Sequence, residues 1–290
     1  MVRLHIKKGD ESQFLYDTTV QIDVDALVKE LLPIYNGRLK VQRICAEIEQ
    51  LASHGICLPP NMQGLADEQI EELHLVDEWA TKCVPSGGSV FKKDDIGRRN
   101  GNAPNEQMAE VLQKAVKEVK DMISKKQAQE NNPMTLAKVT EAIDILRGAV
   151  TIVYPMGLPP HDPIQQEFEN NEDLTGTQAS KEVLEEQTAS IWFAGKEMLR
   201  GKKLKDFVGN NEKTKVIAKL QAKGSGAPAR EAVVSEEEQK QMMAYYYRKQ
   251  EEMKKLEEVD DDSYLNSAWA DSGQLKRQFQ GLTNIKWGPR

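Results

Sequence analysis

Apolar and polar residues alternate at the start of the chain, and this alternation predicts a β-hairpin over residues 1–17. Val2, Leu4 and Ile6 are separated by polar residues in the segment VRLHIK, as in a strand with one buried face. The segment KGDE supplies a turn, and SQFLYD begins the return strand. A helical pattern follows, and a hairpin followed by a helix is how a ubiquitin-like β-grasp begins.

The helical pattern after the hairpin predicts two helices. The first has Asp23 or Asp25 as its N-cap and carries leucine and isoleucine residues on one face. Asn36-Gly37 is expected to end it, because this dipeptide favours turns. A second helix is expected over residues 38–54, with Gly55 as a left-handed cap.

The middle of the chain is predicted to be loop-rich over residues 56–102, apart from one short helix, and helical afterwards. The clearest apolar stripe spans 105–127, and Pro133 introduces another helix. Residues 149–154 continue its helical spacing but include four consecutive β-branched residues, which favour a buried strand. We expect that strand to lie parallel to the first one, as the last strand of a β-grasp does. Asp162-Pro163 starts a further short helix.

The last third of the chain is predicted to be helical. One helix is expected over 179–200, and a basic amphipathic helix is expected over 211–223. Asn210 or Asn211 would cap the basic helix. Residues 224–234, rich in glycine and alanine, form a linker by composition.

Beyond the linker, Ser235 and Glu238 form a capping box for a long charged helix. A last short helix is expected over 274–282. The fold class is therefore mainly α (α+β), with an N-terminal hairpin unit, an elongated multi-helix region and a flexible C-terminal tail. We expect an N-terminal α+β domain over 1–155, a helical region over 156–223, and the linker, long helix and tail over 224–290.

A Lys-Thr pair in the segment GNNEKTKV raises the question of a phosphate-binding loop. Counting back from Lys213, the two glycine positions of such a loop hold Glu212 and Phe207. A carboxylate and a phenyl ring cannot replace a bare backbone that closes around phosphates. We therefore expect no nucleotide site there.

Charge is unevenly distributed along this chain of 290 residues, which has a net charge of −7. Residues 196–230 carry ten basic and three acidic groups. Phe207 is the sole aromatic residue between Phe193 and Arg230, whereas a nucleic-acid surface combines basic groups with several stacking aromatics. We expect no nucleic-acid binding. The 39% share of hydrophobic residues indicates a thin core and an extensive surface.

Other chemistry is disfavoured by residue type and spacing. We expect no signal peptide or membrane span, and three cysteines without a C-x-x-C pair suit a reduced intracellular compartment. A calcium loop starting at Asp260 would have Leu265 where glycine is required. No catalytic or cofactor-binding motif is found. We also expect no metal site from the dispersed candidate ligands Cys45, His54, Cys57, His74 and Cys83.

Several long segments resemble the Kurly protein family of cilia- and flagella-associated proteins. They include DEWATKCVPSGGSVFKKDDIGRRNGNAPNE, GAVTIVYPMGLPPHDPI and NEKTKVIAKLQAKGSGAPARE, and the resemblance continues to the final WGPR. It implies a non-enzymatic factor for motile cilia, associated with outer dynein arm assembly, cilium positioning and planar cell polarity. It also implies a location in the cytoplasm and around the basal body, and it transfers no catalytic or metal-binding residue.

Three hypotheses follow. The leading one is an adaptor that binds dynein arm assembly factors, co-chaperones or axonemal dynein chains through charged helices and an aromatic tail. The alternatives are a stable structural component of the axoneme or basal body, and an enzyme that uses the loop PSGGSVFKKDDIGRRNG. For the exposed aromatics Trp192-Phe193, 245–247, Trp269 and Trp287, packing within the chain is favoured over contact with a partner. The candidate partner-binding residues are Arg98, Arg99, Lys213, Arg230, Tyr246, Trp269 and Trp287.

Overall fold

The computed structural model describes residues 1–228, 236–258, 273 and 280. Its contacts divide the chain into two compact units, Met1–Arg230 and Glu231–Arg290. The boundary expected after residue 155 falls inside the first unit.

A five-stranded sheet forms one end of the first unit, with the strand order β2-β1-β7-β5-β6. The hairpin of β1 and β2 is antiparallel, as predicted, while β1 and β7 are parallel neighbours at the centre. When the five strands are numbered in chain order within this sheet, their spatial order is 2-1-5-3-4, which is the mixed strand order of a β-grasp. The strands are β1 (Val2–Lys8), β2 (Glu11–Thr18), β5 (Ala189–Phe193), β6 (Lys196–Glu197) and β7 (Lys215–Ala222).

The parallel partner of β1 is β7, so the predicted basic helix over 211–223 is wrong. Val216, Ala218 and Leu220 are buried at every second position, which is the period of a strand, while Ile217 between the first two is 41% exposed. Asn211 does not cap a helix, since its side-chain oxygen accepts the Lys213 N–H at 3.0 Å. This contact shapes the turn that leads into β7.

The predicted helix over 179–200 is also wrong, because residues 189–193 and 196–197 of this segment are strands of the sheet. It contains only a short helix, α8 (Gln178–Glu182), followed by the hairpin of β5 and β6. The Trp192 indole N–H donates to the Ser190 hydroxyl at 3.1 Å, and Phe193 packs against the core. Packing within the chain is therefore confirmed for this aromatic pair.

One continuous helix, α1 (Val24–His54), replaces the two predicted after the hairpin. Gly37 does not end it, because it serves helix packing: a Cβ at Gly37 would lie 2.7 Å from the Val139 Cγ1 atom. The Asn36 amide exchanges two hydrogen bonds with the Leu184 backbone, at 2.8 and 3.1 Å. Tertiary contacts thus override the turn preference of this dipeptide.

Residues 149–153 are helical, so the strand expected over 149–154 is wrong. They complete α6 (Leu136–Val153), in which Ala149, Val150 and Val153 are buried at helical spacing. The periodicity therefore indicated the correct element, and the β-branched composition did not.

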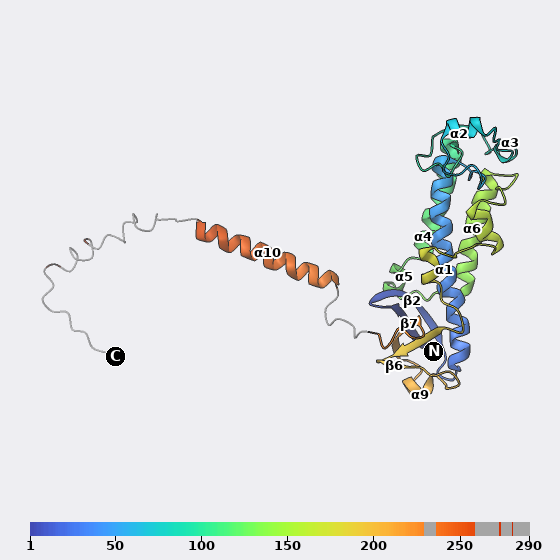
Figure 1. The fold of residues 1–290 in the computed structure, drawn as a ribbon. Helices are drawn as coiled ribbons and strands as arrows, with labels where there is room; N and C mark the ends of the chain where they lie inside the picture. The colour runs from blue at the N-terminus through green and yellow to red at the C-terminus, as the bar shows by residue number, and fades with distance from the viewer. Residues whose placement is uncertain (229–235, 259–272, 274–279, 281–290) are drawn as a thin grey trace. The chain divides into compact units, whose positions relative to one another are not determined.

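The far half of α1 packs against α4 (Glu106–Met122) and α6. Figure 1 shows α1 running from the sheet to a loop-rich end that carries α2 and α3. The short helix expected after residue 66 and the helix after Asp162 are confirmed. The remaining elements are α2 (Asp67–Glu72), α3 (Trp79–Lys82), β3 (Ser89–Phe91), β4 (Asn102–Pro104), α5 (Lys126–Gln129), α7 (Pro163–Glu169) and α9 (Lys205–Val208).

The described part of the second unit is essentially one helix, α10 (Glu236–Glu258), which confirms the predicted long charged helix. The short helix expected over 274–282 and the capping residue Ser235 lie outside the described residues. Within the described part of the chain, no helix combines the length and apolar character needed to cross a membrane.

Candidate functional site

The α10 helix presents large apolar and aromatic side chains to solvent. Tyr245, Tyr246 and Tyr247 are 62, 64 and 75% exposed, and Met242 and Met253 are also exposed. The Tyr245 and Tyr246 rings contact each other edge-on, with centroids 6.1 Å apart. Side chains of this kind usually bury themselves in a core or against another surface. This tyrosine surface, residues 245–247, is the first candidate site.

A second candidate lies at the loop-rich end of the first unit, where residues 55–104 form what we call the apical loops. Gly55 ends α1 with a φ of 79°. A side chain there would collide with the Asn102 carbonyl oxygen, which lies 2.3 Å from the ideal Cβ position. The close approach of two backbones therefore depends on this glycine.

Arg99 joins the apical loops to α1 from the inside. It is 4% exposed, and its Nη1 donates to the Gly55 carbonyl at 2.7 Å. Nη2 donates to the Glu47 carboxylate at 2.7 Å and to the Glu47 carbonyl at 3.2 Å. A second carboxylate, that of Asp162, lies 3.8 Å from Nη1. Arg99 is therefore a buried clamp between the apical loops and α1.

Asp162 connects this clamp to the next helix. It is fully buried, accepts the Ile164 N–H at 3.0 Å as the N-cap of α7, and accepts the Cys57 N–H at 3.1 Å. Burial raises the pKa of Asp162, and the charge of Arg99 opposes that shift. The network of Arg99, Asp162 and Glu47 thus fixes the base of the apical loops.

The loop over 94–99 is shaped by one carboxylate. Asp94 accepts backbone N–H groups from Ile96 at 3.0 Å, Arg98 at 2.9 Å and Arg99 at 3.0 Å. Burial alone would raise the pKa of Asp94, but these donors outweigh it and hold the pKa below its usual value. Because Asp94 occupies these donors, they do not form an open nest for an external anion.

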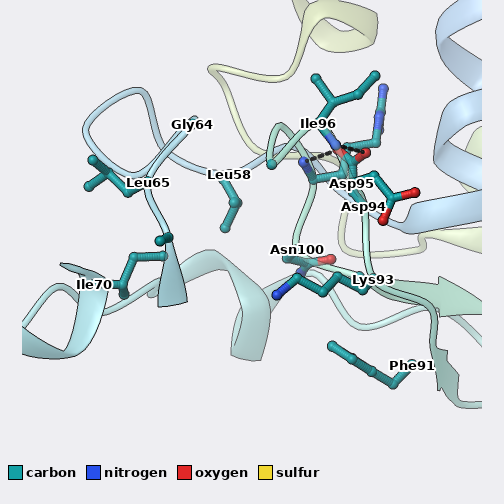
Figure 2. Close-up of a pocket in the computed structure, with 14 residues that line it drawn as sticks. Leu58, Gly64, Leu65, Ile70, Phe91, Lys93, Asp94, Asp95, Ile96 and Asn100 are labelled. Atoms are coloured by element: carbon teal, nitrogen blue, oxygen red, sulfur yellow. Dashed lines mark hydrogen bonds between the residues drawn. The ribbon is translucent and has the colours of Figure 1, made fainter. Parts of the chain in front are cut away.

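Between these segments lies a hollow of about 620 Å³, which we call the apical hollow. Figure 2 shows Leu65 and Ile70 on one wall, Leu58 between the walls, and Ile96 and Phe91 on the opposite segment. Phe91 and Ile96 are 71 and 70% exposed. An apolar hollow with exposed large side chains and charged groups at its edge is suited to binding another protein.

The described residues offer little for covalent or metal chemistry. Burial raises the pKa of the Cys45 and Cys57 thiols to about 11, so both remain protonated at neutral pH. The pKa of the Cys83 thiol is raised for the same reason. No group of three or more histidine, cysteine, aspartate or glutamate side chains in the described ranges is arranged to hold a metal ion.

The sequence-based candidate residues do not converge on one site. Arg98 lies at the apical loops, exposed and 3.2 Å from the Glu47 carboxylate, while Arg99 is buried beside it. Lys213 is exposed in the turn before β7, at the sheet end of the unit. Tyr246 belongs to the tyrosine surface of α10. Arg230, Trp269 and Trp287 lie outside the described residues.

Sequence reasoning missed the apical hollow. A usable signal existed, since Phe91 and Ile96 are large apolar residues within a loop otherwise rich in glycine and charge. Leu58, Leu65 and Ile70 carry no such signal, because only the folded loops bring them opposite Phe91 and Ile96.

Comparisons with known proteins agree along the whole chain. A family model described as cilia- and flagella-associated protein 298 matches residues 189–285. Relatives with that description include proteins from Xenopus laevis, 66% identical, Danio rerio, 66% identical, and Homo sapiens, 63% identical. Each match spans 290 residues and covers 100% of both chains. No solved structure matches the chain significantly.

Proposed function

Because this chain belongs to the cilia- and flagella-associated protein 298 family, we propose that it is a non-enzymatic adaptor for assembly of the outer dynein arms of motile cilia. Membership gives the chain a role connected with cilia and flagella. The adaptor would act in the cytoplasm and near the basal body, before dynein components enter the cilium. Its partners would be assembly factors of the co-chaperone type or axonemal dynein chains.

The tyrosine surface of α10 is the observation that carries this proposal. Exposed tyrosine and methionine side chains on a helix gain stability when they are buried in an apolar groove of another protein. Tyrosine is enriched in the residues that contribute most to protein binding. Met242, Tyr246 and Met253 recur at helical spacing, so docking of this face into a partner's groove would bury all three. Tyr245 and Tyr247 lie about 100° to either side of Tyr246 and would contact the walls of such a groove.

The apical hollow would supply a second contact. Its walls are held by the Arg99 clamp, so it is largely preformed, and a preformed surface loses little conformational entropy on binding. A partner segment with an apolar side chain would fit between Leu65 and Ile96. Two separate surfaces in one chain are what an adaptor requires.

Affinity capture from ciliated-cell cytosol tests the proposal. The full chain should recover axonemal dynein chains or their assembly factors, identified by mass spectrometry. The triple variant Y245Q/Y246Q/Y247Q should recover at least about tenfold less, because glutamine preserves helix propensity but removes the rings. The matched control E251Q/K254Q, on the same helix and without a change in net charge, should behave as the original chain.

Two outcomes would contradict the proposal. Equal recovery by the tyrosine variant and the control would exclude the tyrosine surface as the docking site. Retention of the chain in detergent-extracted axonemes, with none of it bound to dynein components in cytosol, would instead favour a stable structural component.

A further inference from the structure

A second hollow lies at the other end of the first unit, where the β1–β2 hairpin meets α1 and α5 (Figure 1). Its volume is about 300 Å³. It is distinct from both surfaces described above, and we call it the basal hollow. It is lined by Lys8, Glu11, Gln13, Tyr35, Arg38, Leu39, Gln42, Lys125 and Glu182.

Arg38 is 2% exposed and lines this hollow. Nε and Nη2 donate to the Ile123 carbonyl at 3.2 and 2.9 Å, and Nη1 donates to the Gln13 side-chain oxygen at 3.4 Å. The guanidinium also lies over the Phe14 ring, 5.5 Å from its centroid. All these partners are neutral, and no carboxylate among the described residues forms an ion pair with Arg38.

The charge of Arg38 is therefore only partly compensated. The Ile123 carbonyl belongs to the C-terminal end of α4, where the helix dipole supplies partial negative charge. Burial lowers the pKa of Arg38 to about 10, so the side chain remains a cation at neutral pH. A buried cation with neutral partners favours binding of an anion that reaches it.

Lys8 is a second cation that lines the basal hollow and has neutral contacts. Its Nζ donates to the Tyr35 hydroxyl at 2.7 Å and lies 5.4 Å from the centre of that ring. Within the described part of the chain, it too has no carboxylate partner. Lys125, in contrast, is paired with Glu11 at 2.5 Å. Lys8 and Arg38 are thus two cations that line one hollow with only neutral contacts.

We propose that the basal hollow binds a phosphoryl group. A phosphate dianion would match the two charges of Lys8 and Arg38, and the planar guanidinium is well suited to phosphate oxygens. The Gln13 and Gln42 amides line the same space and can donate further hydrogen bonds. The phosphoryl group would be either free inorganic phosphate or part of a phosphorylated side chain.

Isothermal titration of the full chain with inorganic phosphate and with a short phosphoserine peptide tests this, at constant ionic strength in chloride. Either probe should bind, and tighter binding of the peptide would identify a phosphorylated side chain as the source. The K8Q variant should weaken binding at least about tenfold, and R38Q should abolish it. Glu182 also lines the hollow, so E182Q should tighten binding a few-fold by removing a repulsive charge.

K114Q is the matched control, because Lys114 is an exposed lysine on α4 that is paired with Glu110. It should bind phosphate as the original chain does. Circular dichroism of each variant separates lost binding from lost folding. If R38Q does not fold, the comparison of K8Q with K114Q tests the proposal. The proposal is overturned if neither probe binds the original chain, or if K8Q and K114Q weaken binding equally.

Discussion

Two arginines of the first unit are almost completely buried, and their surroundings differ. Arg99 is 4% exposed and faces the carboxylates of Glu47 and Asp162. Arg38 is 2% exposed and contacts two neutral oxygens and a phenyl ring. A buried cation matched by carboxylates serves the fold. A buried cation that lines a hollow and has no carboxylate partner of its own can serve a ligand. The partner of a buried charge is therefore more informative than its burial.

Removing Arg99 should have the largest effect, because it leaves the buried Asp162 carboxylate without its cation and leaves Glu47 with Arg98 alone. R99M should lower the free energy of unfolding by about 3–5 kcal/mol, the cost of breaking a buried ion pair. Chemical denaturation followed by circular dichroism measures this. A loss below about 1 kcal/mol would show that Arg99 is not the clamp of the apical loops.

The loss in free energy of unfolding that R99M causes should be smaller at acid pH than at neutral pH. Burial raises the pKa of Asp162, so ionisation of Asp162 lowers stability as the pH rises through that raised value, and Arg99 limits the effect. Without Arg99 the pKa would lie higher still, and the deficit should shrink by about 1–2 kcal/mol from about pH 7 to about pH 5. A second change, D162N, should restore a similar amount at neutral pH. A deficit independent of pH would contradict this.

Replacing Arg38 should cost less than replacing Arg99. R38M should lower the free energy of unfolding by about 1–2 kcal/mol in phosphate-free buffer, because it leaves the Ile123 carbonyl without a donor but strands no carboxylate. The same denaturation experiment compares the two variants directly. If R38M were as destabilising as R99M, the distinction between the two arginines would fail.

Gly37, next to Arg38 in α1, tests whether α1 and α6 pack closely at this point. G37A should lower stability by about 1 kcal/mol, since its new methyl group would meet Val139 at 2.7 Å and the strain exceeds the gain in helix propensity. Combining it with V139A should remove the strain, so the two changes would cost less together than their sum. Additive losses would contradict the close contact between α1 and α6.

Much of the fold could be predicted from local patterns. The N-terminal hairpin, the α4 stripe, the α7 cap and the long α10 helix all follow from spacing and capping residues. The start of a β-grasp is also apparent from the sequence, but the strand that returns beside β1 is β7 and not the predicted strand over 149–154. In residues 149–153 helical spacing outweighs β-branched composition. In β7 the burial of Val216, Ala218 and Leu220 at every second position is the signal that distinguishes a strand from the predicted helix.

The sites depend on contacts that local patterns do not encode. Asn36-Gly37 has the sequence of a turn, yet Val139 and Leu184 hold it within a helix. Arg98 and Arg99 are adjacent in the sequence, but one is exposed and the other is buried. The basal hollow exists only because the hairpin, α1 and the end of α4 meet around Arg38, and sequence spacing gives no indication of it.

The most direct test of the adaptor function is restoration of outer dynein arms in ciliated cells that lack this protein. Electron microscopy of axoneme cross-sections counts the arms after the chain is returned. The original chain and E251Q/K254Q should restore them, whereas Y245Q/Y246Q/Y247Q, expressed at the same level, should leave most outer arms missing. A full set of arms with the tyrosine variant would contradict the account.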